Sequence, residues 1–263
     1  MQDIVAVLGQ AWITSVMLLA VRIAALLFLT PVLYAVSMPA PVRLAIVLGL
    51  ACVIALPLAG SGTAAVVDVG ALIQAVLVEA SIGATLGLGV LAAFAGFGLA
   101  GRLIDIQVGF GIAQVFDPLT RSRLPILSAI FGLFAAVFFF TIEGHHALMR
   151  GLAYSVELFP IGQGWTPAAA AEPVLKQFGA LFALGFALAA PVVLGLLLVE
   201  FALGVVSRNL PQMNMLAMGI PVKIAAGLLA LSVWATGFGA PASRLYAAIY
   251  QSWTGWFAQE GRR

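Results

Sequence analysis

Residues 66–100 read VVDVGALIQAVLVEASIGATLGLGVLAAFAGFGLA, a run in which Asp68 and Glu79 are the ionisable side chains. Apolar and polar residues do not alternate with a period of two, so the run is predicted to be helical. At about 1.5 Å per residue, a helix over the whole run would be roughly 52 Å long, whereas the hydrocarbon core of a bilayer is about 30 Å thick. The run is therefore expected to form a very long helix, a bent helix or a hairpin.

The composition of the whole chain agrees with a membrane location. Of its 263 residues, 63% are hydrophobic and 8% are charged, and the mean hydropathy is +1.14. A soluble domain carries roughly 25% charged residues and a disordered chain is poor in apolar ones, so both classes are excluded. The net charge is only +2 and the basic residues are scattered, which argues against binding of nucleic acid. The chain is expected to be an all-α integral membrane protein or a helical subunit of a membrane complex.

Other apolar stretches are predicted to form further membrane helices. The stretch 44–59 is short for a span and contains Pro57, and residues 242–257 have the spacing of an amphipathic interfacial helix. Basic residues are divided equally between the two sides of a six-span arrangement, so the positive-inside rule does not orient the chain. The remaining stretches are 12–34, 124–142, 178–206 and 215–240.

Small residues and prolines recur inside these stretches. A row of small residues predicts close packing of helices, either within the chain or against another subunit. Prolines within or at the ends of apolar stretches predict kinked or broken helices. The small-residue row is Gly83, Gly87, Ala92, Gly96 and Ala100, and the prolines are Pro31, Pro57, Pro191 and Pro221.

Arg22, Glu79, Glu200 and Lys223 each lie well inside an apolar stretch. Each such charge costs roughly 2.5 to 3.5 kcal/mol at the middle of a span, so it needs a partner or a watery cavity. Two acids and two bases permit two ion pairs, and Arg102 and Asp105 are spaced to pair on one helix. An ion or proton pathway is one interpretation. We favour ion pairs at helix or subunit interfaces, because the acids are spread over separate segments.

No chemical motif emerges from the sequence. His145 and His146 are adjacent, with Glu143 nearby, and adjacent residues point about 100° apart on a helix. A polar cap on the helix over 124–142 is the simpler interpretation of this element. The single Cys52 excludes an intrachain disulfide. We predict no catalytic, cofactor-binding or metal site, and the chain is not expected to be an enzyme.

The connection 101–125 reads GRLIDIQVGFGIAQVFDPLTRSRLP, which is too apolar for a solvated loop and too rich in glycine and charge for a span. Gly109 and Gly111 loosen the backbone around Phe110, and Asp117-Pro118 marks a turn. Irregular backbone at membrane depth is tolerated inside protein or along a cavity, and apolar constrictions can close a pore. Either a plug or a loop packed beneath the helices fits these facts. The apolar side chains concerned are Val108, Phe110, Ile112, Val115 and Phe116.

Three blocks of sequence resemble the FliR/SctT family of type III secretion export-gate subunits, and the similarity in length and segment order extends over essentially the whole chain. The third block is highly specific, and its motif residues are Pro211, Gln212, Asn214, Gly219 and Pro221. The Gly-His-His element of the second block favours the flagellar branch of the family. The first block contains Arg22, Pro31, Pro39 and Arg43. The second runs from Gly109–Gly111 to Asp117-Pro118 and is followed by FFFTIEGHH at 138–146. The third is NLPQMN at 209–214, followed by GIPVK at 219–223.

This resemblance implies a fold of long kinked helical hairpins in a membrane-associated export gate. A FliP-like part would cover about 1–175 and include a plug loop at 107–124, and a FliQ-like hairpin would cover about 176–263. The partners would be FliP and FliQ, together with FlhA and FlhB, in the inner membrane at the flagellar basal body. Unfolded flagellar proteins would pass through a channel that this loop helps to seal, with no cofactor.

The sequence also allows a protein of another class, a six-helix transporter of ions or small solutes in the inner membrane. Such a protein would function alone and would bind its substrate near broken helices. The absence of detectable internal repeats and the spread of the acids argue against this alternative.

Overall fold

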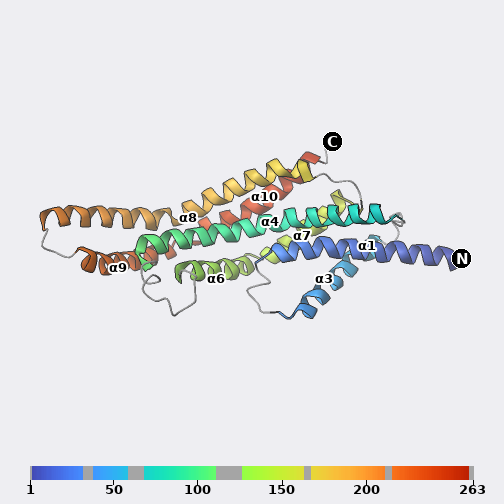
Figure 1. Ribbon diagram of the computed structural model, residues 1–263, viewed down its shortest axis with the longest axis horizontal. Coiled ribbons are helices and arrows are strands. Elements are labelled where there is room, and N and C mark those ends of the chain that lie inside the picture. Colours follow the sequence, from blue (N-terminus) through green and yellow to red (C-terminus); the bar gives the residue numbers. More distant parts are fainter. Residues whose placement is uncertain are drawn as a thin grey trace. The chain divides into compact units, whose positions relative to one another are not determined.

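The computed structural model describes residues 2–31, 38–58, 68–110, 126–162, 167–210 and 215–260. Within these ranges every regular element is a helix, which confirms the expected all-α class (Figure 1). The elements are α1 (Gln2–Leu29), α3 (Ala40–Ala55), the short 3-10 helix η1 (Leu56–Leu58), α4 (Val69–Val108), α6 (Ile126–Thr141), α7 (Gly144–Leu158), α8 (Pro167–Asn209), α9 (Met215–Ala235) and α10 (Gly239–Glu260).

Several of these helices are suited to crossing a membrane. In the described ranges, four helices are long and apolar enough, namely α1, α4, α8 and α9. The bent pair α6 and α7 makes a fifth if it is counted as one span. Helix α3 has only 16 residues, fewer than the roughly 20 that a span needs. The chain is therefore a helical membrane protein.

Helix α4 is a single helix of 40 residues, so the first of the three forms expected for this run is the one observed. The expectation that irregular structure begins at Gly101 is wrong, because α4 continues to Val108. The reason is tertiary packing. A Cβ atom on Gly101 would lie 2.7 Å from the Cα atom of Ser128 in α6, and Ile104 and Asp105 are buried.

The Gly-His-His element was expected to form a polar cap on α6, and this expectation is wrong. Helix α6 ends at Thr141, and Gly144 begins the separate helix α7. Between them, Glu143 has a φ of 56°, in the left-handed region that L-residues seldom occupy. This conformation interrupts the helix, so the two histidines lie in the first turn of α7.

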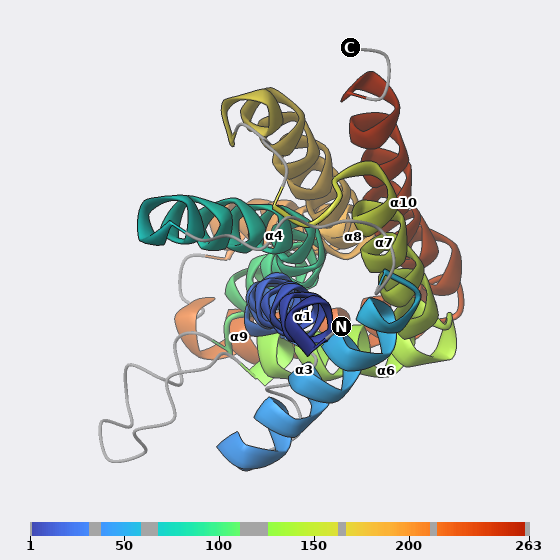
Figure 2. The same cartoon turned by 90° about the vertical axis from the view of Figure 1, so that its right-hand side faces the viewer.

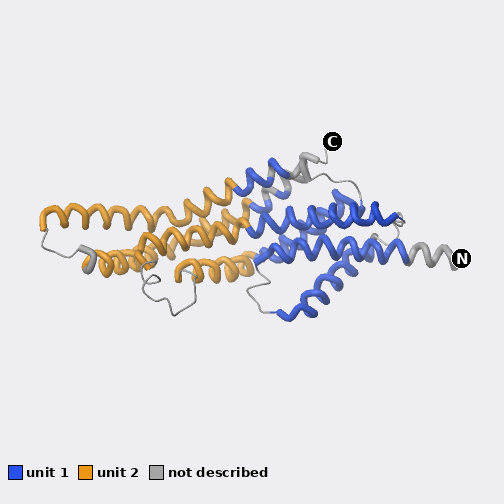
Figure 3. Tube along the Cα trace, in the orientation of Figure 1, with its two compact units in different colours: residues 1–91, 143–178, 249–263 blue, residues 92–142, 179–248 orange. Residues whose placement is uncertain are grey.

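The chain forms two compact units (Figure 3). Unit 1 comprises residues 1–91, 143–178 and 249–263, and unit 2 comprises residues 92–142 and 179–248. Because α4, α8 and α10 contribute to both units, this division differs from the FliP-like and FliQ-like parts that the resemblance implies. That assignment stays a prediction.

In unit 1, α3 and α4 both pack against α1 (Figure 2). Glycines make the contact with α4 possible. A Cβ atom on Gly83 would overlap the carbonyl oxygen of Arg22, and one on Gly87 would lie 2.8 Å from the Cβ atom of Leu29. The predicted small-residue row thus packs within the chain here.

Unit 2 combines a similar backbone contact with an aromatic core. A Cβ atom on Gly185 of α8 would lie 2.7 Å from the carbonyl oxygen of Gly96 in α4. The hydroxyl of the buried Tyr246 donates a hydrogen bond of 2.7 Å to the carbonyl oxygen of Ala135, which ties α10 to α6. The ring of Tyr246 lies against those of Phe94, Phe97, Phe138 and Phe139. Phe238 extends this cluster to Phe131 and Trp234.

The membrane helices differ strongly in burial. In α4, 56% of the most apolar part is buried within the chain, whereas the buried share of the corresponding part is 28% in α8 and 6% in α9. Large apolar side chains such as Phe201, Leu229 and Val233 are at least 70% exposed. Helices α8 and α9 therefore present apolar surface that needs lipid or another protein around it.

The contact between Gly185 and Gly96 gives a test of this packing. In Gly185→Ala, the added methyl group meets the backbone of α4, and we expect a loss of about 1 to 3 kcal/mol in the free energy of unfolding. Gly195→Ala on the same helix is the matched control, because nothing lies within 4 Å of its Cβ position. Thermal unfolding of the purified protein in detergent measures both, and equal stability of the two variants would contradict the packing.

Candidate functional site

Arg22 is fully buried within the apolar helix α1, and it pairs with Glu79 of α4. The distance from Arg22 Nε to Glu79 Oε2 is 2.6 Å, and both side chains are 0% exposed. One of the two ion pairs that the sequence permits is therefore formed within unit 1.

Other groups complete this cluster, which we call the Arg22 network. Arg22 Nη1 donates to the carbonyl oxygen of Ser155 at 2.9 Å and to its hydroxyl oxygen at 3.2 Å. Arg22 Nη2 donates to the carbonyl oxygen of Phe159 at 2.9 Å, and Glu79 Oε1 accepts the backbone N–H of Gly162 at 3.2 Å. The network thus joins α1, α4, α7 and the turn at 159–162.

The geometry of the Arg22 network is that of a structural clamp. Burying two charges is costly, and their attraction offsets this cost only when further hydrogen bonds satisfy the remaining donors and lone pairs. Here those bonds come from the carbonyl oxygens of Ser155 and Phe159, the Ser155 hydroxyl and the backbone amide of Gly162. A shift of α1 along α4 would break several of these bonds together.

The second permitted pair is formed in unit 2. Lys223 Nζ of α9 lies 3.4 Å from Glu200 Oε2 of α8, and Gln107 Nε2 of α4 donates to the same oxygen at 3.0 Å. The Glu200 side chain is 54% exposed and that of Lys223 is 20% exposed. This cluster links three helices, but its carboxylate stays accessible to a neighbour.

Asp105 makes contacts that the sequence analysis missed. Its Oδ1 and Oδ2 atoms accept the backbone N–H groups of Leu127 and Ser128 at 3.1 and 3.0 Å, and the side chain is buried. The first N–H groups of a helix lack partners within the helix, and an anion there is stabilised by the helix dipole. The ion pair expected between Arg102 and Asp105 is absent, since Arg102 is exposed and the carboxylate binds the start of α6 instead.

Three of the predicted plug residues belong to the described chain. Val108 is fully buried, and a Cβ atom on Gly227 of α9 would lie 2.6 Å from its Cγ2 atom. Gly109 has a φ of 95°, a conformation that favours glycine, and Phe110 is half-buried. The other predicted plug residues, Gly111, Ile112, Val115, Phe116, Asp117 and Pro118, lie outside the described residues.

The motif residues of the third block are described only in part. Gly219 and Pro221 lie in α9, where Pro221 is inside the helix. Pro211, Gln212 and Asn214 lie outside the described residues. The assignment of this motif stays a prediction.

Comparison with known proteins identifies the family. The sequence pattern of the family described as Bacterial export proteins, family 1, matches residues 13–249. The chain belongs to this family of export proteins. The family expected from the three sequence blocks, that of the FliR proteins, is thereby confirmed.

Individual members of the export family show how far the similarity extends. The flagellar biosynthetic protein FliR of Pectobacterium carotovorum is 30% identical over 224 residues, 84% of each chain. The protein of the same name from Escherichia coli K12 is 30% identical over 220 residues, 83% of each chain. That of Bacillus subtilis is 37% identical over 159 residues, which cover 59% of this chain and 61% of that protein.

Of the two histidines of this export-family chain, His146 lies at the surface of α7 and His145 is half-buried. His146 Nδ1 is 3.4 Å from Glu143 Oε2, and both side chains are exposed. Among the residues that the structure describes, no three histidine, cysteine or acidic side chains gather where they could hold a metal ion.

The Arg22 network predicts a large effect of removing its carboxylate. In Glu79→Gln, the Arg22 guanidinium stays buried without a counter-charge, and we expect a loss of about 3 to 5 kcal/mol in stability. The apolar double variant Arg22→Met with Glu79→Leu should recover much of this loss. Thermal unfolding in detergent is the measurement.

A matched control for this prediction is Glu172→Gln, which breaks the 2.7 Å pair between Glu172 and Lys176 on the surface of α8. Exposed pairs contribute little, so this variant should unfold like the unmodified protein. A Glu79→Gln protein as stable as this control would refute the clamp.

Proposed function

We propose that this chain is a structural and gating subunit of the flagellar type III protein export channel. It would help to form and seal the pore through which unfolded flagellar proteins leave the cell. Its membership of an export family, the flagellar names of its relatives and its membrane helices support this proposal. We place it in the inner membrane, at the flagellar basal body.

The observation that carries the sealing role is the anchoring of the described helices on either side of residues 111–125. At one end, Val108 is fixed beneath Gly227 of α9. At the other, Asp105 of α4 holds the first turn of α6 through Leu127 and Ser128. An apolar segment with two fixed ends suits a constriction that closes a pore by excluding water.

The charged clusters would serve assembly rather than chemistry. The Arg22 network fixes the register of α1, α4 and α7, and the half-exposed Glu200 offers a carboxylate to a neighbouring subunit. We propose FliP and FliQ as the direct neighbours of the apolar surface on α8 and α9, with FlhA and FlhB in the same machine. Energy for export would come from elsewhere in the machine, and this chain would catalyse no reaction.

A transporter of small solutes is the weaker alternative. Glu79 and Asp105 are engaged in hydrogen bonds with neighbouring helices, and the family is one of export proteins. No observation favours an ion pathway over these structural roles.

Shortening the proposed plug tests the sealing role. Removing residues 110–116 leaves Asp105 and Val108 in place, and we expect cells to become leaky to ions and small molecules. A deletion of the same length in another connection, removal of 60–66, should leave the membrane tight. Growth in the presence of a normally excluded small toxic compound reports the leak. If cells with an assembled but shortened protein stay tight, the loop is not a seal.

The pair on α8 and α9 tests the assembly role. Neutralising either member, as in Glu200→Gln or Lys223→Gln, should reduce copurification of FliP and FliQ several-fold. The exchange Glu200→Lys with Lys223→Glu restores the pair within the chain while it reverses the charge offered outward. Recovery of copurification by the exchange would assign the effect to the internal pair, and a continued loss would assign it to a partner. Unchanged copurification in both single variants would refute the assembly role.

A further inference from the structure

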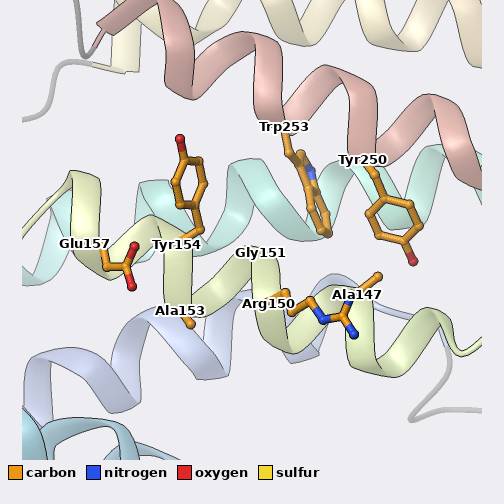
Figure 4. A pocket seen from close by; sticks show the side chains of 8 residues that line it. All are labelled: Ala147, Arg150, Gly151, Ala153, Tyr154, Glu157, Tyr250 and Trp253. Carbon is orange, nitrogen blue, oxygen red and sulfur yellow. The ribbon is translucent and has the colours of Figure 1, made fainter.

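A cavity of about 660 Å³ lies between α7 and α10 in unit 1 (Figure 4). Its lining includes Arg150, Tyr154 and Glu157 from α7 and Tyr250 and Trp253 from α10. This volume is within the range of sites for small molecules and cofactors, which is about 300 to 1,000 Å³. Nothing in the function proposed above uses this cavity.

Trp253 and Tyr250 form a fixed aromatic wall. Gly151 lets the indole approach α7 closely, because a Cβ atom there would lie 2.6 Å from Trp253 Cζ3. The rings of Tyr250 and Trp253 are 5.5 Å apart, and the Tyr250 hydroxyl donates to the carbonyl oxygen of Gly144 at 3.2 Å. Burial raises the pKa of Tyr250 to about 12.

Arg150 supplies an unused positive charge. Its side chain is exposed, and within the described part of the chain its guanidinium forms no hydrogen bond or ion pair. Glu157 lies two helical turns further along α7, and Figure 4 shows it apart from Arg150. A planar guanidinium with free donors matches the oxygens of a phosphate, which it can bind through two parallel hydrogen bonds.

The surroundings point to a lipid rather than to a soluble anion. The described ranges contain four helices suited to a membrane, and α7 buries one face through Leu148, Leu152 and Val156 while it exposes the charged one. Tyrosine and tryptophan rings favour the headgroup level of a bilayer, and basic pockets of membrane proteins bind lipid headgroups. A soluble phosphate bound to Arg150 would leave the aromatic wall unused.

We propose that this cavity binds the phosphodiester headgroup of a membrane glycerophospholipid. Arg150 holds the phosphate oxygens, and the rings of Trp253 and Tyr154 contact the glycerol and the first part of the acyl chains. The site makes one lipid a bound component of the protein rather than part of the surrounding bilayer.

Native mass spectrometry of the full-length protein, purified with the subunits that it assembles with, tests the site. After lipid removal, dioleoyl phosphatidylglycerol or dioleoyl phosphatidylethanolamine is added back. We expect one retained phospholipid for each copy of the chain, and at least about tenfold weaker retention in Arg150→Gln, because the charge-assisted contact with the phosphate is lost. Arg150→Lys should fall between, because an ammonium does not form the two-bonded contact.

Two further variants sharpen the test. Arg244→Gln removes another exposed arginine, one on α10 that does not line the cavity, and should retain lipid normally. Ala153→Trp fills the cavity without changing its charge and should lose the lipid as Arg150→Gln does.

Three outcomes would overturn the proposal. The first is equal lipid retention with and without the Arg150 guanidinium. The second is displacement of the lipid by inorganic phosphate, which would show that the cavity binds a soluble anion. The third is loss of a copurifying subunit, with lipid retention unchanged, in Arg150→Gln, which would show that a protein segment occupies the cavity.

Discussion

The buried pair of Arg22 and Glu79 is the constraint on which unit 1 depends. An unpaired charge inside an apolar helix costs several kcal/mol, so each of these helices is acceptable only beside the other. The remaining donors of Arg22 then require the carbonyl oxygens of Ser155 and Phe159, and Glu79 requires the amide of Gly162. Three separate parts of the chain, α1, α4 and the stretch 155–162, are thus held in one register by polar groups, in a protein whose other contacts are mostly apolar and nondirectional.

Glycines allow the short distances between helices that this packing requires. Gly83 and Gly87 let α4 approach the backbone of α1 beside Arg22, and Gly96 and Gly185 do the same for α4 and α8 in unit 2. In lipid the hydrophobic effect does not drive helices together, so close packing and hydrogen bonds must do so. Small residues and buried charges are therefore complementary in this chain, because the first permit the contact and the second fix its alignment.

The sequence predicts those features that depend on local composition. Long apolar runs indicate helices, and a charge within such a run indicates a partner, which is why the pairs of Arg22 with Glu79 and of Lys223 with Glu200 could be anticipated. The hydrogen bonds of Asp105 could not be anticipated, because Leu127 and Ser128 follow it by more than twenty residues and Arg102 lies nearer in sequence. The start of α7 was missed for a related reason, since the left-handed Glu143 has no signal in its residue type. The plug residues beyond Phe110 stay predictions.

The hydropathy of a helix does not show whether the helix faces lipid or protein. The fraction of its surface that is buried in the structure distinguishes the two cases. Helices α1 and α4 bury much of their apolar surface within the chain, whereas α8 and α9 expose Phe201, Leu229 and Val233. Glu200, which precedes Phe201 in α8, is half-exposed. A carboxylate facing lipid alone would be costly even with Lys223 beside it, but a neighbouring subunit could supply hydrogen-bond donors. The position of one accessible carboxylate among large apolar side chains therefore favours a protein neighbour at α8 and α9 over a bilayer alone.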